Sequence, residues 1–188
     1  AELVSYYAEI SRSDESVARI LAQIDTRGVA ADTIVVMVGD NGGALLRGKG
    51  TLYELGVRVP LIVRWPGVVK PGVAIAEIVS GEDLAPTLLE AAGLPVPREM
   101  TGRSFLPLLR GTPFEPRRYV YSERGAHGDL HPVNSAEFDL ARAIISRTHK
   151  LIYNATWQLP YVPVDFMGQP FWTDIKERAR WGTLDPTF

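Results

Sequence analysis

Two oxygen-bearing side chains, Asp40 and Asn41, come directly after an apolar run at residues 33–38, and Lys49 follows shortly after them. A carboxylate beside an amide oxygen suits a hard divalent cation, which takes oxygen ligands. The lysine ammonium is a compact positive charge, as expected where an oxyanion lies beside such a cation. These residue types and their spacing therefore indicate a paired cation and anion site in the segment 39–60.

The apolar run at 33–38 predicts the element that positions these side chains. A short run rich in β-branched residues that ends in Gly39 and an acid is typical of a buried central strand of a parallel sheet, covered on both faces. Ligands of such sheets gather at the carboxyl ends of the strands, where Asp40 and Asn41 stand. The glycines around them allow the backbone to approach a ligand closely or to adopt positive φ.

The same residues have a second interpretation as a simple turn. Asp and Asn side chains bond their own backbone after a strand, and Gly supplies the left-handed position. Alone, Asp40-Asn41-Gly42 favours the turn. The residues that follow favour a site: the segment 49–60 reads Lys-Gly-Thr-Leu-Tyr-Glu-Leu-Gly-Val-Arg-Val-Pro, and an apolar strand at 61–65 ends in Trp65-Pro66-Gly67.

This combination resembles the sulfatases of the alkaline-phosphatase-like superfamily. Their pattern is Asp-Asn-Gly, a Gly-Lys-Gly-Thr-x-Tyr-Glu-x-Gly-x-Arg-x-Pro loop, and an apolar strand ending in Trp-Pro-Gly. The resemblance extends upstream through residues 6–21 and downstream through 83–89 and 101–109. It implies an α/β fold, in which this chain forms the C-terminal part of an alkaline-phosphatase-like parallel-sheet sandwich, followed by a small antiparallel-sheet subdomain.

Carried over residue by residue, the resemblance implies that Asp40 and Asn41 are two ligands of a calcium-type ion, with Mg²⁺ as the alternative. It implies that Lys49 is a catalytic residue that binds the sulfate group. The cation and the lysine would share the negative charge of the sulfate oxygens, and charge stabilisation of this kind is usually the largest catalytic contribution. The neighbours of Arg47 do not match the family position, so we expect a solvated charge there.

Two parts of the family's site do not appear in the sequence. The family's nucleophile is a formylglycine made from the first residue of Cys-x-Pro-x-Arg or Ser-x-Pro-x-Arg, and this chain contains no Cys and no Ser in that pattern. The paired aspartates that complete the metal site are also not visible, although Ca²⁺ takes about six to eight oxygens. We therefore expect a C-terminal fragment, inactive alone, of an enzyme whose N-terminal part carries the formylglycine.

The remaining sequence predicts the surrounding elements. An amphipathic helix at 3–24 should end at Gly28, and a second helix should begin at residues 80–83 and end at Gly93. The segment 95–116 is rich in Pro and Gly, which predicts a surface traverse without regular structure. Short strands at 119–122, 142–146 and 150–153 predict the antiparallel sheet. We therefore expect two domains, 1–112 and 113–188, the second of them truncated.

The C-terminal region suggests the substrate. His127 lies in a polar, glycine-rich loop of the kind that often carries substrate contacts, and the family resemblance makes it our candidate, with an idle surface histidine as the alternative. His149, in a predicted turn, is expected to be solvated. The residues 147–154, 158–161 and 171–175 are similar to the sulfamidase branch, the N-sulfoglucosamine sulfohydrolases, although that branch tends to have Arg at the position of Lys49.

The sulfamidase likeness implies a sulfated amino sugar or another sulfated glycan as substrate. Four aromatic side chains could then flank a sugar ring, and packing in a core or an interface is the alternative for all of them: Tyr161, Phe166, Trp172 and Trp181.

The composition of the chain limits the classes of partner that it is expected to bind. The chain has 188 residues, is 46% hydrophobic and carries a formal charge of -2, which suits a domain with a sizeable core. Its 20 basic and 22 acidic side chains are interspersed, so nothing favours nucleic acid. The sequence contains no run of about 18 apolar residues, so it predicts no membrane-spanning helix. The resemblance suggests a periplasmic, secreted or lysosomal location, and the oligomeric state is left open.

The sequence thus predicts a metal-dependent sulfuric ester or sulfamate hydrolase that acts on a sulfated sugar. A phosphonate monoester or phosphodiester hydrolase on the same scaffold is an alternative, because sulfate and phosphate oxygens require similar counter-charges. A catalytically silent glycan-binding module that keeps the fold without the nucleophile is another.

Overall fold

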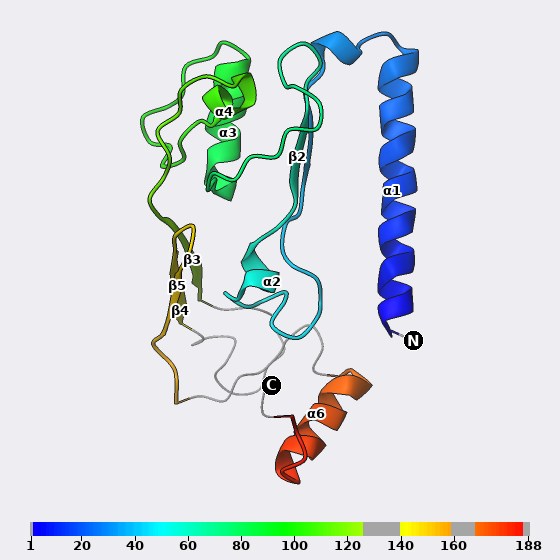
Figure 1. The fold of residues 1–188 in the computed structure, drawn as a ribbon, viewed down its shortest axis with the longest axis vertical. Coiled ribbons are helices and arrows are strands. Elements are labelled where there is room, and N and C mark those ends of the chain that lie inside the picture. The colour runs from blue at the N-terminus through cyan, green and yellow to red at the C-terminus, as the bar shows by residue number, and fades with distance from the viewer. Residues whose placement is uncertain (1, 126–139, 159–167, 186–188) are drawn as a thin grey trace. The chain divides into compact units, whose positions relative to one another are not determined.

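The computed structural model describes residues 2–125, 140–158 and 168–185 (Figure 1). The chain forms two compact units. The first contains Ala1–Met37, Leu61–Ile75 and Leu84–Phe114, and the second contains Val38–Pro60, Ala76–Asp83 and Glu115–Phe188. The division into domains 1–112 and 113–188 stays a prediction.

The first unit begins with α1, Glu2–Thr26, which confirms the predicted helix. The helix ends as its sequence indicated, because Gly28 adopts a φ of 67° and its N–H donates to the carbonyl of Asp25 at 3.0 Å. Large apolar side chains of α1 stay exposed, among them Val4, Tyr7, Ile10 and Ile20. None of the described helices has the length and apolar character that crossing a bilayer requires.

The short 3-10 helix η1, Ala30–Asp32, leads into β1, Val35–Val38, which pairs with β2, Leu61–Arg64, in a two-stranded sheet (Figure 1). Both predicted strands are therefore confirmed. The full burial expected for the first strand is not found, since Met37 and Val38 are exposed. Among the described residues β1 has a single partner strand, and each of the two strands has two exposed residues.

The core of the first unit lies where the sheet meets α3, Leu84–Ala91, and α4, Leu106–Arg110. The predicted end of α3 is confirmed by Gly93, which has a φ of 71°. The prediction of a traverse without regular structure is wrong at α4, whose Leu106 is fully buried beside Phe105. Pro107 sits in the first turn, where its fixed φ favours a helix, and the leucines around it supply the buried side chains.

Thr87 on α3 ties the two helices together, and its replacement by valine should be costly. Its buried hydroxyl accepts the N–H of Phe105 at 2.9 Å. Valine keeps the shape of threonine and leaves that N–H unsatisfied, so we expect Thr87→Val to lower the free energy of unfolding by about 1–3 kcal/mol. Urea unfolding of the full-length protein measures this. Thr87→Ser keeps the hydroxyl and should lose less, and equal losses for the two variants would contradict the assignment.

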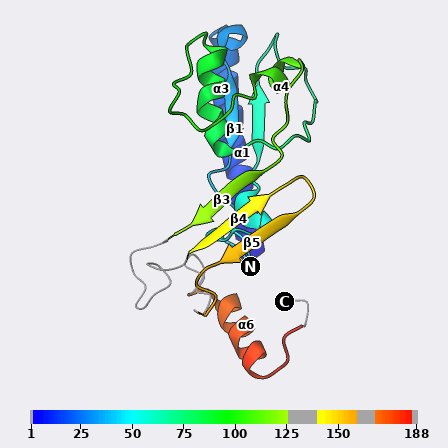
Figure 2. The same cartoon turned by 90° about the vertical axis from the view of Figure 1, so that its left-hand side faces the viewer.

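The second unit contains a three-stranded antiparallel sheet, which confirms the prediction for this region (Figure 2). Its strands are β3, Val120–Arg124, β4, Ala141–Ile145, and β5, Lys150–Asn154. In the register, Ala143 lies between Ser122 and Ile152 and is buried. The turn between β4 and β5 is closed by the N–H of Ser146, which donates to the carbonyl of His149 at 2.8 Å. His149 is exposed, as expected.

Among the described residues of the second unit, Asp83 is the most buried charged group. It ends the 3-10 helix η2, Gly81–Asp83, and is 2% exposed. Its Oδ2 accepts the N–H of Ser80 at 2.8 Å and the Nε–H of Arg117 at 3.2 Å, and its Oδ1 accepts a second guanidinium N–H of Arg117. Residues 80–83 were predicted to begin α3, and Asp83 at their end also forms a bidentate ion pair with Arg117.

The helix α6, Pro170–Arg180, was not predicted, although Phe171, Trp172 and Ile175 recur at helical spacing in a mainly polar and charged segment. Proline at the first turn and arginines in the last turn favour a helix here. Trp172 is half-buried, whereas Trp181 is 74% exposed beneath the guanidinium of Arg180, 5.8 Å from the ring centre. The other two candidate aromatics, Tyr161 and Phe166, lie outside the described residues.

Candidate functional site

The site segment 39–60 connects β1 to β2 and folds back on itself within the second unit. Its base is closed by the N–H of Gly39, which donates to the carbonyl of Pro60 at 3.0 Å. Further in, the N–H of Gly42 reaches the carbonyl of Gly56 at 3.1 Å. A single-turn helix, α2, Glu54–Val57, shapes the returning half. The segment is thus a compact loop rather than an open connection.

Glycine is required where the loop packs against itself. A Cβ on Gly42 would lie 1.6 Å from the carbonyl oxygen of Leu55, and one on Gly48 would lie 2.2 Å from that of Gly43. On Gly56 it would lie 2.3 Å from the carbonyl oxygen of Thr51. The sequence indicated that the glycines beside Asp40 and Asn41 allow close approach to a ligand or positive φ. At Gly42, Gly48 and Gly56 the structure shows close approach to the loop's own backbone.

Gly42→Ala should therefore disturb the loop. The new methyl group has to displace the backbone carbonyl of Leu55, and overpacking of this kind costs about 1–3 kcal/mol of unfolding free energy. Gly81→Ala is the matched control, because nothing lies within 4 Å of its Cβ position and its φ is not left-handed. Thermal unfolding of the two variants in the full-length protein measures the difference. Equal midpoints would contradict the close packing of the loop.

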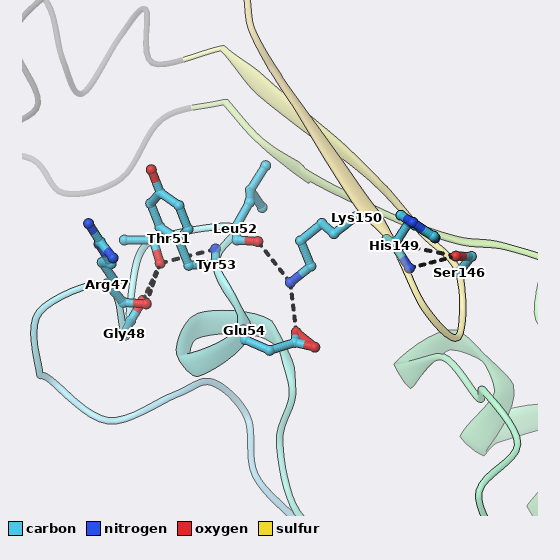
Figure 3. A network of polar contacts seen from close by, with 9 residues as sticks. All are labelled: Arg47, Gly48, Thr51, Leu52, Tyr53, Glu54, Ser146, His149 and Lys150. Carbon is cyan, nitrogen blue, oxygen red and sulfur yellow. Dashed lines mark hydrogen bonds and ion pairs between the residues drawn. The ribbon is translucent and has the colours of Figure 1, made fainter. Parts of the chain in front are cut away.

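Thr51 fixes the turn that precedes the returning half of the loop (Figure 3). Its buried hydroxyl lies 2.8 Å from the carbonyl oxygens of both Arg47 and Gly48. These contacts hold Arg47 at a φ of 59°, a left-handed conformation that is costly for a residue other than glycine. Arg47 is exposed, as expected, and its guanidinium lies 5.5 Å from the ring centre of Tyr53.

Asp40 and Asn41 stand at the end of β1, as predicted. Asp40 is exposed, and its Oδ1 accepts the N–H of Asn41 at 2.9 Å, which is the local bond that the turn interpretation requires. The donor set, a carboxylate and a neighbouring amide oxygen on an accessible loop, also fits part of the shell of a hard cation. Across the described ranges, no group of three or more His, Cys, Asp or Glu side chains is arranged to hold a metal ion.

Lys49 lies in the same loop, is half-buried, and donates its backbone N–H to the carbonyl of Gly43 at 2.8 Å. The loop therefore carries all three predicted residues of the cation and anion site. Their roles stay predictions. His127, the predicted substrate contact, lies outside the described residues.

Two positively charged side chains of the antiparallel sheet contact this loop and were not predicted from the sequence. Arg124 at the end of β3 donates to the carbonyl of Gly50. Lys150 at the start of β5 donates to the carbonyl of Leu52 at 3.2 Å and pairs with Glu54 at 2.8 Å (Figure 3). These partners are 74 to 98 positions apart in sequence, so no local pattern could have indicated them.

Comparison with known proteins identifies relatives of the chain. An ulvan-active sulfatase of Formosa agariphila is 33% identical over 165 residues, which cover 88% of this chain and 31% of that protein. Human N-sulphoglucosamine sulphohydrolase is 29% identical, over 97% of this chain and 37% of its own length. The solved phosphonate monoester hydrolase of Silicibacter pomeroyi has a TM-score of 0.59 and 24% identity, over 93% of this chain and 40% of that one.

The chain thus spans about a third of the length of these two relatives. The likeness to the solved hydrolase shows a shared fold, with helices and strands in a common arrangement. The family model described as Sulfatase matches residues 1–94, a range that includes the whole loop from Gly39 to Pro60. Since that range is half of the 188 residues, the chain belongs to the sulfatase family.

Proposed function

We propose that the full-length protein carrying this chain is a sulfuric ester or sulfamate hydrolase that acts on a sulfated sugar. The observation that carries the proposal is the family match over the loop 39–60, which holds Asp40, Asn41 and Lys49. Two relatives, by name an ulvan-active sulfatase and an N-sulphoglucosamine sulphohydrolase, support a carbohydrate substrate. A periplasmic, secreted or lysosomal location agrees with this family, and nucleic acid has no part in the proposal.

In this proposal Asp40 and Asn41 supply part of the oxygen shell of a divalent cation, Ca²⁺ or alternatively Mg²⁺. When bound, that cation would polarise the sulfate oxygens as a Lewis acid. The ammonium of Lys49 binds a sulfate oxygen and offsets negative charge as the S–O or S–N bond breaks. The loop's bonds between Gly42 and Gly56 and between Lys49 and Gly43 support this role, because they fix the backbone from which these side chains project.

Other parts of the proposal involve residues beyond the loop. The formylglycine nucleophile would come from outside these 188 residues, which alone would be inactive. His127 would contact the leaving group, and the pair β1–β2 would belong to a larger parallel-sheet sandwich of the alkaline-phosphatase-like type.

A second candidate function is hydrolysis of phosphonate monoesters or phosphodiesters, favoured by the fold shared with the Silicibacter pomeroyi enzyme. Assaying the full-length protein with an aryl sulfate, an aryl phosphodiester and an aryl phosphonate separates the two. We expect the highest kcat/KM for the sulfate, and the reverse order would favour the second candidate. A folded protein without turnover of any of the three would favour a glycan-binding module.

A further inference from the structure

Arg124 and Lys150 of the antiparallel sheet contact the same stretch of loop that carries Lys49. We propose that Lys150, assisted by Arg124, is a positioning residue that holds the loop 47–54 so that Lys49 meets the anion. The inference rests on the proposed function for the role of Lys49.

The contacts of Lys150 place a largely buried charge against the loop. Its side chain is 16% exposed, and its Nζ lies between the carbonyl oxygen of Leu52 at 3.2 Å and the carboxylate of Glu54 at 2.8 Å (Figure 3). Hydrogen bonds that involve a charged group are roughly twice as strong as neutral ones. The ammonium therefore fixes the backbone at Leu52 and the start of α2 together.

The backbone on both sides of Lys49 is fixed as well. Before it, the carbonyl of Gly48 accepts the hydroxyl of Thr51, and at it, the N–H of Lys49 donates to Gly43. After it, the carbonyl of Gly50 accepts a guanidinium N–H of Arg124. Glycine is the most permissive residue type, and Gly48 and Gly50 flank Lys49, so these partners restrict peptide groups that could otherwise adopt more conformations.

Arg142 provides the control for loss of a cation from this sheet. It lies on β4, between the two strands that carry Arg124 and Lys150. Its Nε lies 3.4 Å from the carboxylate of Glu123 on β3, and both side chains are about three-quarters exposed. Arg142→Met also removes a positive charge from the sheet. The ion pair that it breaks joins two residues of the sheet, Arg142 and Glu123.

A double-mutant cycle in the full-length protein tests whether Lys150 acts through Lys49. With Lys49 present, we expect Lys150→Met to lower kcat for an aryl sulfate about tenfold, because small misplacements of a catalytic group are costly. In a Lys49→Ala background the same change should lower kcat less than about twofold. Lys150→Arg should recover most of the loss, and Arg142→Met should leave kcat unchanged. Equal losses from Lys150→Met in the two backgrounds would overturn the proposal.

Hydrogen exchange gives a readout that does not depend on turnover. We expect Lys150→Met to speed exchange of the Lys49 and Thr51 amides about tenfold, while Arg142→Met leaves them protected. Unchanged protection in Lys150→Met would overturn the positioning role whatever the activity. Faster exchange together with a Lys49→Ala variant that turns over sulfate normally would instead overturn the proposed function and leave the loop contact established.

Discussion

Replacing Lys49 by alanine is expected to lower kcat for an aryl sulfate by about 10²–10³-fold while the full-length protein keeps its fold. Removing one preorganised group that stabilises developing charge costs this much in other enzymes. The backbone bond of the loop at this position should survive, because it uses the N–H of Lys49, which alanine retains. Steady-state kinetics and the thermal unfolding midpoint, measured on the same sample, test both parts.

Two further variants make the result specific. Lys70→Ala removes an exposed lysine outside the site loop and should leave kcat unchanged. Lys49→Arg keeps the charge and should recover part of the activity. If Lys49→Ala loses less than about threefold in kcat, Lys49 does not contact the transition state.

Replacing Asp83 by alanine should lower the free energy of unfolding by about 3–5 kcal/mol, the usual loss when one partner of a buried ion pair is removed. The change leaves the guanidinium of Arg117, which is 13% exposed, without its bidentate acceptor. It also removes the acceptor of the Ser80 N–H. Denaturant unfolding of the full-length protein measures the loss.

An exposed pair supplies the comparison for Asp83. Asp174 accepts the Nε–H of Arg178 at 2.8 Å on α6, and both side chains are more than half exposed, so Asp174→Ala should cost under about 1 kcal/mol. The double variant Asp83→Ala/Arg117→Ala should lose less than the sum of the single changes, because the buried charge is then absent. Additive losses would show that the pair does not act as a unit.

Elements with strong local patterns could be predicted from the sequence. These patterns depend on neighbours within a few residues. They are the apolar periodicity of α1, the residues that begin and end α3, and the alternation in the short strands β3 to β5. The missed helices gave weaker signals: α2 is a single turn, α4 is short and lies in a segment rich in Pro and Gly, and the apolar residues of α6 stand in a mainly charged segment. The burial of β1 was overestimated, because apolar residue types predict that a strand is buried but do not identify the elements that pack against it.

The candidate site divides in the same way. Asp40, Asn41 and Lys49 could be identified because they lie in one continuous motif. Lys150 and Arg124 could not, since only the folded sheet brings their charges to the loop. A sequence pattern therefore identified the groups proposed to do chemistry and missed those that hold them.

The packing of the loop's glycines decides which positions of the loop can be varied in the laboratory. Positions 42, 48 and 56 accept no side chain without backbone movement, so randomising them would fill a library with misfolded clones. Arg47 and Tyr53 are exposed on the same loop, and of the two only Arg47 has a left-handed φ, which disfavours β-branched residues there. Directed evolution of substrate preference should therefore begin with a small combinatorial library at those two positions.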